Sequence, residues 1–135
     1  MIRAATPDDI PALLEMGRKF AEEAGVAAQL GWSDDHATAL LGLLQADHIL
    51  LIGDRAFIGG TIFPHPFSGE LVFQELFWRS EGRDGLKLLA EAERLAKERG
   101  ATRFLMIAID TMPGAERIYQ RRGYRPAERS FIKEL

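Results

Sequence analysis

The sequence predicts an α/β protein, a single domain in which helices flank a central mixed sheet. Apolar residues recur at helical spacing in four separate stretches. Between the second and third stretches, short runs rich in β-branched and aromatic residues alternate with turn residues, as in a hairpin followed by another strand. At 135 residues the chain is sized for one hydrophobic core, so we expect one domain over 1–135 with one site.

The N-terminal third is predicted to contain a short strand and two helices. Residues 2–6 form the strand, and Thr6 with Asp9 has the spacing of a helix cap. The first helix is expected to end near Gly25. After a loop, Ser33 and the acidic residues that follow it predict the start of a second helix.

Three antiparallel strands are predicted in the middle of the chain. Residues 49–52 and 55–63 have the pattern of a hairpin, for which we expect Gly53-Asp54 as the two-residue turn. Residues 69–78 follow as the next strand, rich in aromatic and β-branched residues.

The C-terminal part continues with helix, strand, helix and strand. A helix is predicted from Asp84 to Gly100, where basic residues and glycine stand in the order expected of a helix end. The apolar run over 103–110 predicts a strand buried on both faces. A last helix is predicted from Pro113 to Gly123, and residues 128–135 are expected to form a final strand.

Composition and charge exclude several classes of function. The net charge is −3 with basic residues spread along the chain, so we expect no nucleic-acid partner. The longest apolar run covers only 104–109, so no membrane span is expected, and two early aspartates argue against a signal peptide and for a cytoplasmic protein. The chain has no cysteine, and its three histidines lack metal-ligand spacing, so we expect no metal.

The junction over residues 78–89 is the first candidate site. Ligands of α/β units collect where a strand leads into a helix, because the helix N-terminus offers free N–H groups and a partial positive charge. Two glycines allow close approach of the backbone, and Arg79, Arg83 and Lys87 add positive charge. An anionic group such as a pyrophosphate would fit, although an ordinary capped turn explains the stretch equally well.

Tyr119 is the second candidate. It shares a helix face with Ala115, Ile118 and Arg122, so its hydroxyl should be carried toward the sheet, where it needs a partner. One interpretation is a core tyrosine bonded to a backbone carbonyl. The other is a proton donor for a leaving group that would otherwise depart as an anion.

The sequence resembles the GNAT superfamily of acetyl-coenzyme A-dependent N-acetyltransferases over nearly its whole length. The strongest match is AERIYQRRGY (115–124), which is similar to the C-terminal A-x-x-x-Y-x-x-x-G-[FY] signature of that superfamily. FIGG (57–60) is similar to its glycine-containing third strand, and ELFW (75–78) followed by residues 85–101 to its coenzyme-binding core. In its small size the chain resembles phage-encoded members of that superfamily.

The resemblance implies a GNAT-like fold and transfer of an acetyl group from acetyl-CoA to a primary amine. It implies that Tyr119 is the general acid, with Glu75 as candidate base and oxyanion donors from the backbone near Phe77 or Trp78. Residues expected at the coenzyme are Phe77, Trp78, Arg79, Gly82, Arg83, Asp84, Gly85, Leu86 and Lys87. Trp32 and the loop over 26–32 are expected to shape the acceptor pocket.

Two departures from the superfamily pattern support other interpretations. In RSEGRD (79–84), Asp84 stands at the last small position of the pyrophosphate loop and is expected to cap the helix, competing for the N–H groups that a phosphate needs. Met112 replaces a frequent asparagine. The alternatives are a catalytically silent GNAT-like module that binds acyl-CoA or a protein, and a nucleotide-binding module, which lacks a Walker motif. The sequence does not identify the acceptor amine. It is compatible with a homodimer.

Overall fold

A five-stranded mixed sheet forms the centre of the molecule in the computed structural model, which describes residues 1–110 and 113–135. The strands are ordered β1 to β5 across the sheet; β1 to β4 are antiparallel neighbours, and β5 runs parallel to β4. Their bounds are Arg3–Ala4 (β1), Ile49–Gly53 (β2), Ala56–Pro64 (β3), Leu71–Ser80 (β4) and Arg103–Leu105 (β5). The predicted α/β fold class with a mixed sheet is confirmed.

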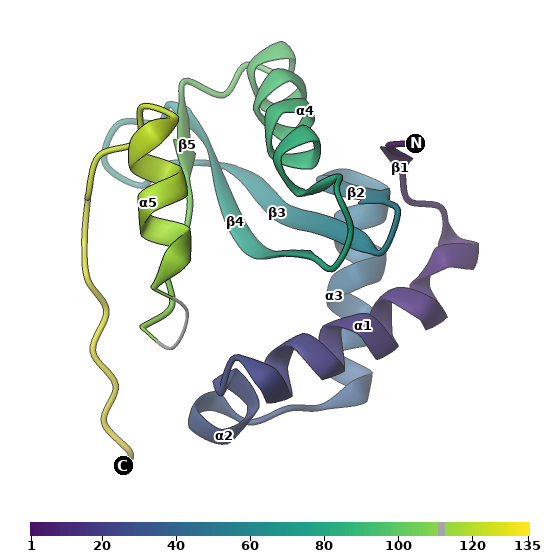
Figure 1. Ribbon diagram of the computed structural model, residues 1–135. Helices are drawn as coiled ribbons and strands as arrows, with labels where there is room; N and C mark the ends of the chain where they lie inside the picture. Colours follow the sequence, from purple (N-terminus) through teal and green to yellow (C-terminus); the bar gives the residue numbers. More distant parts are fainter. Residues whose placement is uncertain (111–112) are drawn as a thin grey trace.

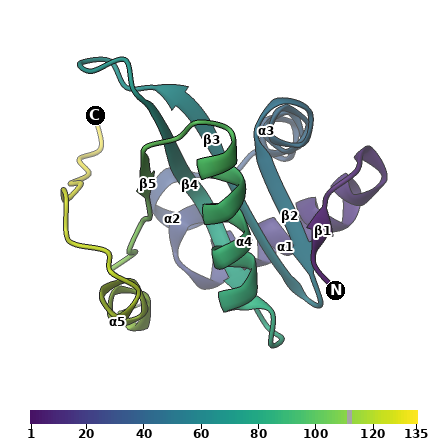
Figure 2. The same cartoon turned by 90° about the horizontal axis from the view of Figure 1, so that it is seen from above.

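Helices cover both faces of this sheet (Figures 1 and 2). The described helices are η1 (Pro7–Asp9, a 3-10 turn), α1 (Ile10–Glu23), α2 (Val26–Leu30), α3 (Asp34–Asp47), α4 (Gly85–Glu98) and α5 (Gly114–Arg121). Helix α4 lies on one face, while α1 and α3 lie on the other. Helix α5 stands beside β5, at the opposite end of the sheet from β1.

Each face of the sheet has its own apolar core. Under α4, the buried side chains Ile58 and Phe73 pack with Leu88 and Leu89. Under α1 and α3, Phe57 packs with residues that include Leu13, Leu41, Leu44 and Leu50. Because burial of apolar area is the main stabilising term in folding, these two layers hold the helices against the strands whose ends form the site.

The predicted helix starts in the N-terminal third are confirmed. The Asp9 carboxylate accepts a hydrogen bond of 2.8 Å from the Thr6 backbone N–H, and Ser33 Oγ accepts one of 3.3 Å from the N–H of His36. The stretch 26–32, expected to be a loop, contains the short helix α2.

The hairpin is present, but its turn lies one residue later than predicted. Gly53 pairs with Ala56, so the turn residues are Asp54 and Arg55. Arg55 has a φ of 48°, in the left-handed region. A residue outside the hairpin stabilises this turn: the N–H of Asp54 donates a hydrogen bond to the Asp84 carboxylate at 2.9 Å.

The C-terminal strands are shorter than predicted. Strand β5 has three residues, and none of them is buried, so the prediction of a strand buried on both faces over 103–110 is wrong. Residues 128–135, expected to form a final strand, form neither helix nor strand, and Phe131 is 88% exposed. The segment leaves α5 on the side away from β5 (Figure 1), so it has no neighbouring strand to pair with. Residues with strand propensity form a strand only when their backbone groups pair with such a neighbour.

Candidate active site

A β-bulge in β4 lies at the centre of the candidate site. Gly59 of β3 pairs with Phe77, and the next residue, Gly60, pairs with Glu75. Leu76 therefore has no partner opposite it. A bulge of this kind bends the strand and re-aims the side chains around it, which is why bulges are frequent beside active sites.

Strands β4 and β5 separate next to this bulge. Their parallel pairing ends at Gln74 and Leu105, while β4 continues to Ser80. Beyond Gln74, the β5 side of β4 has no strand partner among the described residues. We call this opening the wedge. Backbone N–H and C=O groups that face it are free of a ladder and available to a ligand.

Glu75 is the buried carboxyl group at the closed end of the wedge. Its side chain is 4% exposed, and its Oε1 accepts a hydrogen bond of 3.4 Å from the backbone N–H of Ile107. Burial raises the pKa of Glu75 to about 8, because desolvation disfavours the charged form, and the bond from Ile107 only partly opposes this.

Tyr119, on α5, also binds the backbone of Ile107. Its side chain is 7% exposed, and its hydroxyl donates a 2.7 Å hydrogen bond to the carbonyl oxygen of Ile107. Burial raises the pKa of the Tyr119 phenol well above its usual value, and the nearby Glu75 charge adds to the effect. The phenol therefore keeps its proton at physiological pH. The helical face predicted for Tyr119 is confirmed, and its partner is a backbone carbonyl.

Trp78 joins the end of β4 to both flanking helices. Its indole N–H donates to the carbonyl of Gly85, the first residue of α4, at 3.0 Å. Its ring lies 5.9 Å from that of Tyr119, between ring centroids. The Trp78 side chain therefore fixes the start of α4 relative to Tyr119.

The Arg79 guanidinium is paired with two carboxylates and is not free to bind an anion at the start of α4. Its Nη2 contacts the carboxylates of Glu23, at the end of α1, and Glu81, the latter at 3.0 Å. Glu81 also pairs with Lys19 of α1 at 3.2 Å. The loop after β4 is thus tied to α1 by a small network of charges.

Asp84 precedes α4 at the cap position, but its carboxylate turns toward the β2–β3 turn. It accepts from the Asp54 N–H, and within the described ranges it makes no bond to the amides of α4. The prediction that Asp84 occupies the N–H groups of this helix is therefore wrong. These amides have no acceptor within the helix, since the first turn of any α-helix leaves them unpaired.

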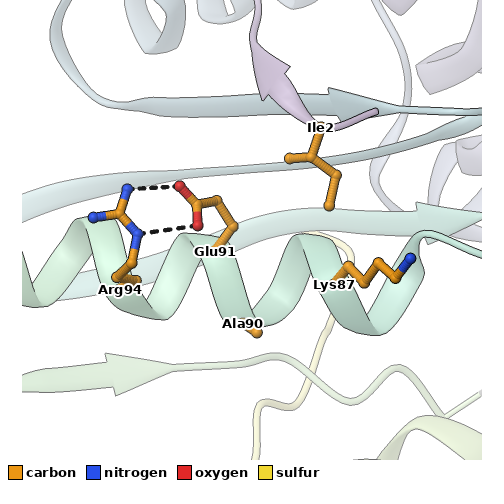
Figure 3. A pocket seen from close by; sticks show the side chains of 5 residues that line it. All are labelled: Ile2, Lys87, Ala90, Glu91 and Arg94. Atoms are coloured by element: carbon orange, nitrogen blue, oxygen red, sulfur yellow. Dashed lines mark hydrogen bonds and ion pairs between the residues drawn. The ribbon is translucent and has the colours of Figure 1, made fainter.

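Gly82 and Gly85, in the loop between β4 and α4 and at the start of α4, allow this loop to pack closely against its neighbours. A Cβ at Gly82 would lie 2.5 Å from the carbonyl oxygen of Asp54, and one at Gly85 would lie 2.9 Å from Cβ of Ser80. Glycine is needed at these positions for the loop to lie against its neighbours. The other predicted coenzyme residues, Arg83, Leu86 and Lys87, are exposed at this end of α4, where Lys87 lines a shallow hollow beside Ile2 (Figure 3).

An apolar pocket of about 280 Å³ opens on the other face of the sheet, under α1, α2 and α3. We call it the apolar pocket. Its lining residues are Leu13, Leu14, Gly17, Phe20, Ala21, Val26, Trp32, Ala37, Leu40, Leu41, Phe57, Leu76 and Phe77. The predicted acceptor-pocket residue Trp32 and the first residue of α2 are among them, together with the bulge residue Leu76.

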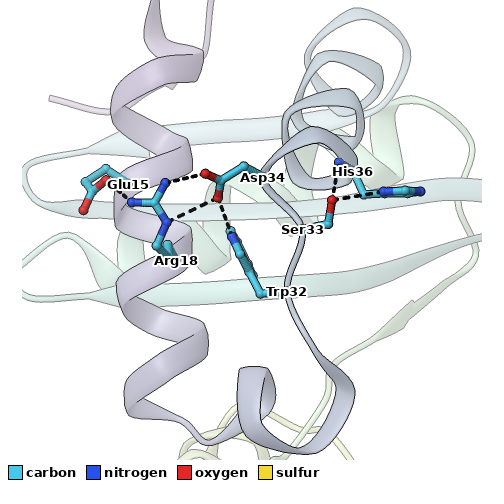
Figure 4. Close-up of polar contacts among 6 residues, drawn as sticks. All are labelled: Glu15, Arg18, Trp32, Ser33, Asp34 and His36. Carbon is cyan, nitrogen blue, oxygen red and sulfur yellow. Dashed lines mark hydrogen bonds and ion pairs between the residues drawn. The ribbon is translucent and has the colours of Figure 1, made fainter.

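Trp32 is fixed at this pocket by polar contacts (Figure 4). Its indole N–H donates to Asp34 Oδ1 at 2.7 Å, and the Asp34 carboxylate in turn pairs with Arg18 at 3.0 Å. Arg18 also pairs with Glu15 on the same helix. These contacts orient the aromatic side chain that forms part of the pocket wall.

Two further features bear on the class of protein. Among residues 1–110 and 113–135, no group of three or more histidine, aspartate or glutamate side chains gathers as a metal site would require. In the same part of the chain, no helix combines the length and apolar character of a membrane span. The prediction about Met112 lies outside the described residues.

The sequence matches no protein-family model and no curated protein. Solved structures do match the fold over the whole chain. A ribosomal-protein-alanine N-acetyltransferase from Brucella melitensis biovar Abortus 2308 has a TM-score of 0.76 at 17% identity, covering 100% of this chain and 98% of that one. The fold and the β4–β5 wedge thus define the class: the chain has the fold of the GCN5-related N-acetyltransferases.

Two other neighbours illustrate the range of proteins built on this fold. A GCN5-related N-acetyltransferase from Ralstonia eutropha JMP134 has a TM-score of 0.75 at 22% identity, covering 100% of this chain and 97% of that one. A protein described as a transcriptional regulator from Bacillus halodurans C-125 has a TM-score of 0.73 at 18% identity, covering 100% and 99%. At these identities the likeness establishes the fold.

Sequence reasoning missed two residues that organise the site. Ile107 binds both Glu75 and Tyr119 through its backbone, which no side-chain pattern can reveal. Glu23 holds Arg79 from 56 positions away in the sequence, so local spacing contains no signal for it. The catalytic and coenzyme roles of the predicted residues stay predictions.

Proposed function

We propose that the protein is an N-acetyltransferase that transfers an acetyl group from acetyl-CoA to a primary amine by direct attack, with Glu75 as general base and Tyr119 as general acid. The observation that carries the proposal is the meeting of these two buried groups at Ile107, at the closed end of the wedge. Paired titratable groups whose environments set their pKa values far apart are typical of acid–base sites.

The described residues fit acetyl-CoA at the wedge and at the start of α4. The unpaired edge of β4 offers backbone groups, and the Asp84 carboxylate is turned away from the first amides of α4. Arg83 and Lys87 add exposed positive charge beside them. These features suit an extended amide-containing arm and a pyrophosphate. Acetyl-CoA would supply an acetyl thioester and a thiolate leaving group.

Glu75 has the properties that a base for an alkylamine needs. An alkylammonium group with a pKa of about 10 is almost wholly protonated at neutral pH, so a proton must leave before nitrogen can attack. Only the ionised form of Glu75 can accept that proton. With the pKa raised to about 8 this form is the minor one at pH 7, but it is a stronger base than an ordinary glutamate, so turnover should rise as the pH approaches 8. The new N–C bond forms as the C–S bond breaks, and the amine proton passes to Glu75 directly or through water.

Tyr119 would supply the proton that the departing thiolate takes up. Burial keeps the phenol protonated, so it acts as an acid and not as a base. Its hydroxyl must turn from the Ile107 carbonyl toward the sulfur to do so. A general acid of this kind contributes about 10²- to 10⁴-fold in rate.

Release of free thiol from acetyl-CoA in the presence of a panel of primary amines tests the proposal, with the acetylated products identified by mass spectrometry. We expect wild-type protein to acetylate at least one class of amine and Tyr119→Phe to do so about 10²- to 10⁴-fold more slowly. Equal turnover by the two proteins would contradict the role of Tyr119.

A catalytically silent binding module is the second candidate function, and two observations favour it. Arg79 is held by Glu23 and Glu81, and the Tyr119 hydroxyl is bonded to a backbone carbonyl. Such a module would bind acetyl-CoA without releasing thiol from it in the presence of any amine. Thiol release that depends on an amine excludes this alternative.

A further inference from the structure

Tyr119 is the side chain that anchors α5. Among the residues of this helix that the structure describes, it is the only buried one. Its ring contacts two other aromatic rings, that of Trp78 at 5.9 Å and that of Tyr124 at 5.7 Å between centroids. Aromatic rings at such distances pack favourably, so these two neighbours determine where the Tyr119 ring lies.

The two neighbours differ in what they are attached to. Tyr124 directly follows the end of α5, and its N–H donates to the carbonyl of Tyr119 at 3.0 Å, so it belongs to the same local unit as Tyr119. Trp78 belongs to β4, where it pairs with Ile58 of the central strand β3, and its indole N–H donates to the carbonyl of Gly85 at 3.0 Å. Trp78 is therefore the neighbour that relates Tyr119 to the sheet and to α4.

A glycine at the first position of α4 brings this helix close to the indole. A Cβ at Gly85 would lie 2.9 Å from Cβ of Ser80 and 4.0 Å from Cζ2 of Trp78. Because Gly85 has no side chain, α4 begins directly against the end of β4, and its first carbonyl lies within reach of the indole N–H. The Trp78 side chain thus has a fixed partner on each side, α4 through its N–H and Tyr119 through its ring.

Proton transfer from Tyr119 depends on where its oxygen lies. The hydroxyl now donates to the Ile107 carbonyl, and rotation of the hydrogen about the C–O bond redirects it without moving the oxygen. An acid must lie within about 2.6–3.2 Å of the atom that it protonates. Since a misplacement of about 1 Å can cost about 10²-fold in rate, whatever fixes the Tyr119 ring also affects turnover.

We infer that the Trp78 side chain is a positioning residue for the proposed reaction: it holds the Tyr119 oxygen in a fixed place relative to the start of α4. This inference rests on the proposed acetyl transfer, and it names a further side chain on which the general acid depends. The indole needs no contact with either substrate for this role. The Trp78 backbone, considered above for the oxyanion, is the same in every variant proposed below.

Two substitutions at Trp78 separate its ring from its N–H. Trp78→Leu removes both, whereas Trp78→Phe keeps an aromatic ring and removes only the donor to Gly85. We expect Trp78→Leu to lower kcat about 10- to 100-fold and Trp78→Phe to restore most of this loss. The Kd for acetyl-CoA should weaken by no more than about fivefold in either variant, the worth of one hydrogen bond.

A double-mutant cycle with Tyr119→Phe decides whether Trp78 acts through the Tyr119 hydroxyl. Without that hydroxyl there is no proton to position, so Trp78→Leu should lower kcat in the wild-type background and not lower it further in Tyr119→Phe. Phe104→Leu is the matched control. Phe104 is also partly buried against the core under α4, but its ring contacts Tyr124 and, among the described residues, not Tyr119. Its effect on kcat should be small and equal in both backgrounds.

A second readout needs no turnover. The chain has two tyrosines, so labelling the tyrosine Cζ atoms with ¹³C gives two NMR signals, which Tyr119→Phe assigns. The rate at which the Tyr119 hydroxyl proton exchanges with water reports how firmly its bond to Ile107 is held. We expect this exchange to be at least about tenfold faster in Trp78→Leu and unchanged in Trp78→Phe and Phe104→Leu. Urea unfolding of each variant shows that it is folded.

The outcomes separate this inference from the proposed function. A kcat loss in Trp78→Leu that disappears in the Tyr119→Phe background, together with faster hydroxyl exchange, supports Trp78 as a positioning residue. An equal loss of kcat in both backgrounds would show that Trp78 only packs in the core, and unchanged hydroxyl exchange in Trp78→Leu would also overturn the inference. If wild type acetylates no amine, the proposed transfer fails, and hydroxyl exchange alone decides whether Trp78 positions Tyr119.

Discussion

Glu75 and Tyr119 bind the two polar groups of the same residue, Ile107. The Glu75 carboxylate accepts from its N–H at 3.4 Å, and the Tyr119 hydroxyl donates to its carbonyl at 2.7 Å. The two side chains come from β4 and α5, so one short backbone segment after β5 fixes their relative positions. Their proton states are linked as well, because the Glu75 charge helps to raise the pKa of Tyr119.

Removal of the Tyr119 hydroxyl should separate catalysis from coenzyme binding. We expect Tyr119→Phe to lower kcat about 10²- to 10⁴-fold and to leave the Kd for acetyl-CoA nearly unchanged. The free energy of unfolding should fall by about 1 kcal/mol, since the hydrogen bond from the buried Tyr119 side chain to the Ile107 carbonyl is lost. Steady-state kinetics, titration calorimetry and urea unfolding measure the three quantities.

Tyr124→Phe is the matched control for this variant. The ring of Tyr124 lies 5.7 Å from that of Tyr119, and its buried hydroxyl has no hydrogen-bond partner among the described residues. Its removal should cost less stability and leave turnover unchanged. An equal loss of turnover in both variants would mean that ring packing, and not the Tyr119 proton, limits the rate.

The raised pKa of Glu75 predicts a specific dependence of stability on pH. In the folded protein this group holds its proton up to about pH 8, whereas in the unfolded chain it ionises near 4.5. Stability contributed by the neutral carboxyl is thus complete below pH 4.5 and is lost as the pH rises through 8. Glu75→Gln keeps a neutral side chain of the same shape, so this loss should be absent.

Urea unfolding from pH 5 to pH 9 compares the two proteins. We expect similar stability at pH 5 and a growing advantage of Glu75→Gln as the pH rises toward 8, with a slope of at most about 1.4 kcal/mol per pH unit. The same variant should be inactive, because glutamine cannot accept a proton. Parallel pH curves for wild type and variant would show that Glu75 is not held neutral by burial.

The loop after β4 should tolerate no side chain at Gly82. A Cβ there would lie 2.5 Å from the Asp54 carbonyl oxygen, so the loop and the β2–β3 turn would have to separate. Gly82→Ala should lower the free energy of unfolding by about 1–3 kcal/mol and weaken acetyl-CoA binding by displacing the start of α4. Gly114→Ala, with open space at its Cβ position, is the control and should do neither. If Gly82→Ala has the same free energy of unfolding as wild type, the loop at Gly82 does not pack closely against Asp54 in solution.

The exposed C-terminal segment should contribute little to stability. Because residues 128–135 form no strand and Phe131 is exposed, deletion of 128–135 should leave the Tm unchanged within the error of calorimetry. A Tm lowered by several degrees would instead indicate that the segment pairs with the sheet in solution.

The sequence predicted those elements whose signals are local. Ser33 marks the start of α3, and the helical spacing around Tyr119 predicts its buried face, because caps and periodicity act within a few residues. The resemblance at 115–124 and the order of the elements also led to the correct fold. The candidate pair Glu75 and Tyr119 was found this way, and the structure brings both to one residue.

The errors concern features that depend on distant partners. Residues 128–135 have strand propensity, but a strand also needs a neighbour to pair with. Asp84 has the residue type and position of a helix cap, yet its carboxylate binds the N–H of Asp54, 30 positions earlier. The partner of Arg79 on α1 is equally invisible to spacing rules, because it depends on how α1 crosses the sheet.

Isothermal titration with acetyl-CoA, and with coenzyme A for comparison, tests the central claim that the wedge and the start of α4 hold this donor. We predict a micromolar or lower Kd for acetyl-CoA, since the Asp84 carboxylate leaves the first amides of α4 available. Absence of binding up to millimolar concentration would contradict the account and exclude both acetyl transfer and a silent acetyl-CoA-binding module.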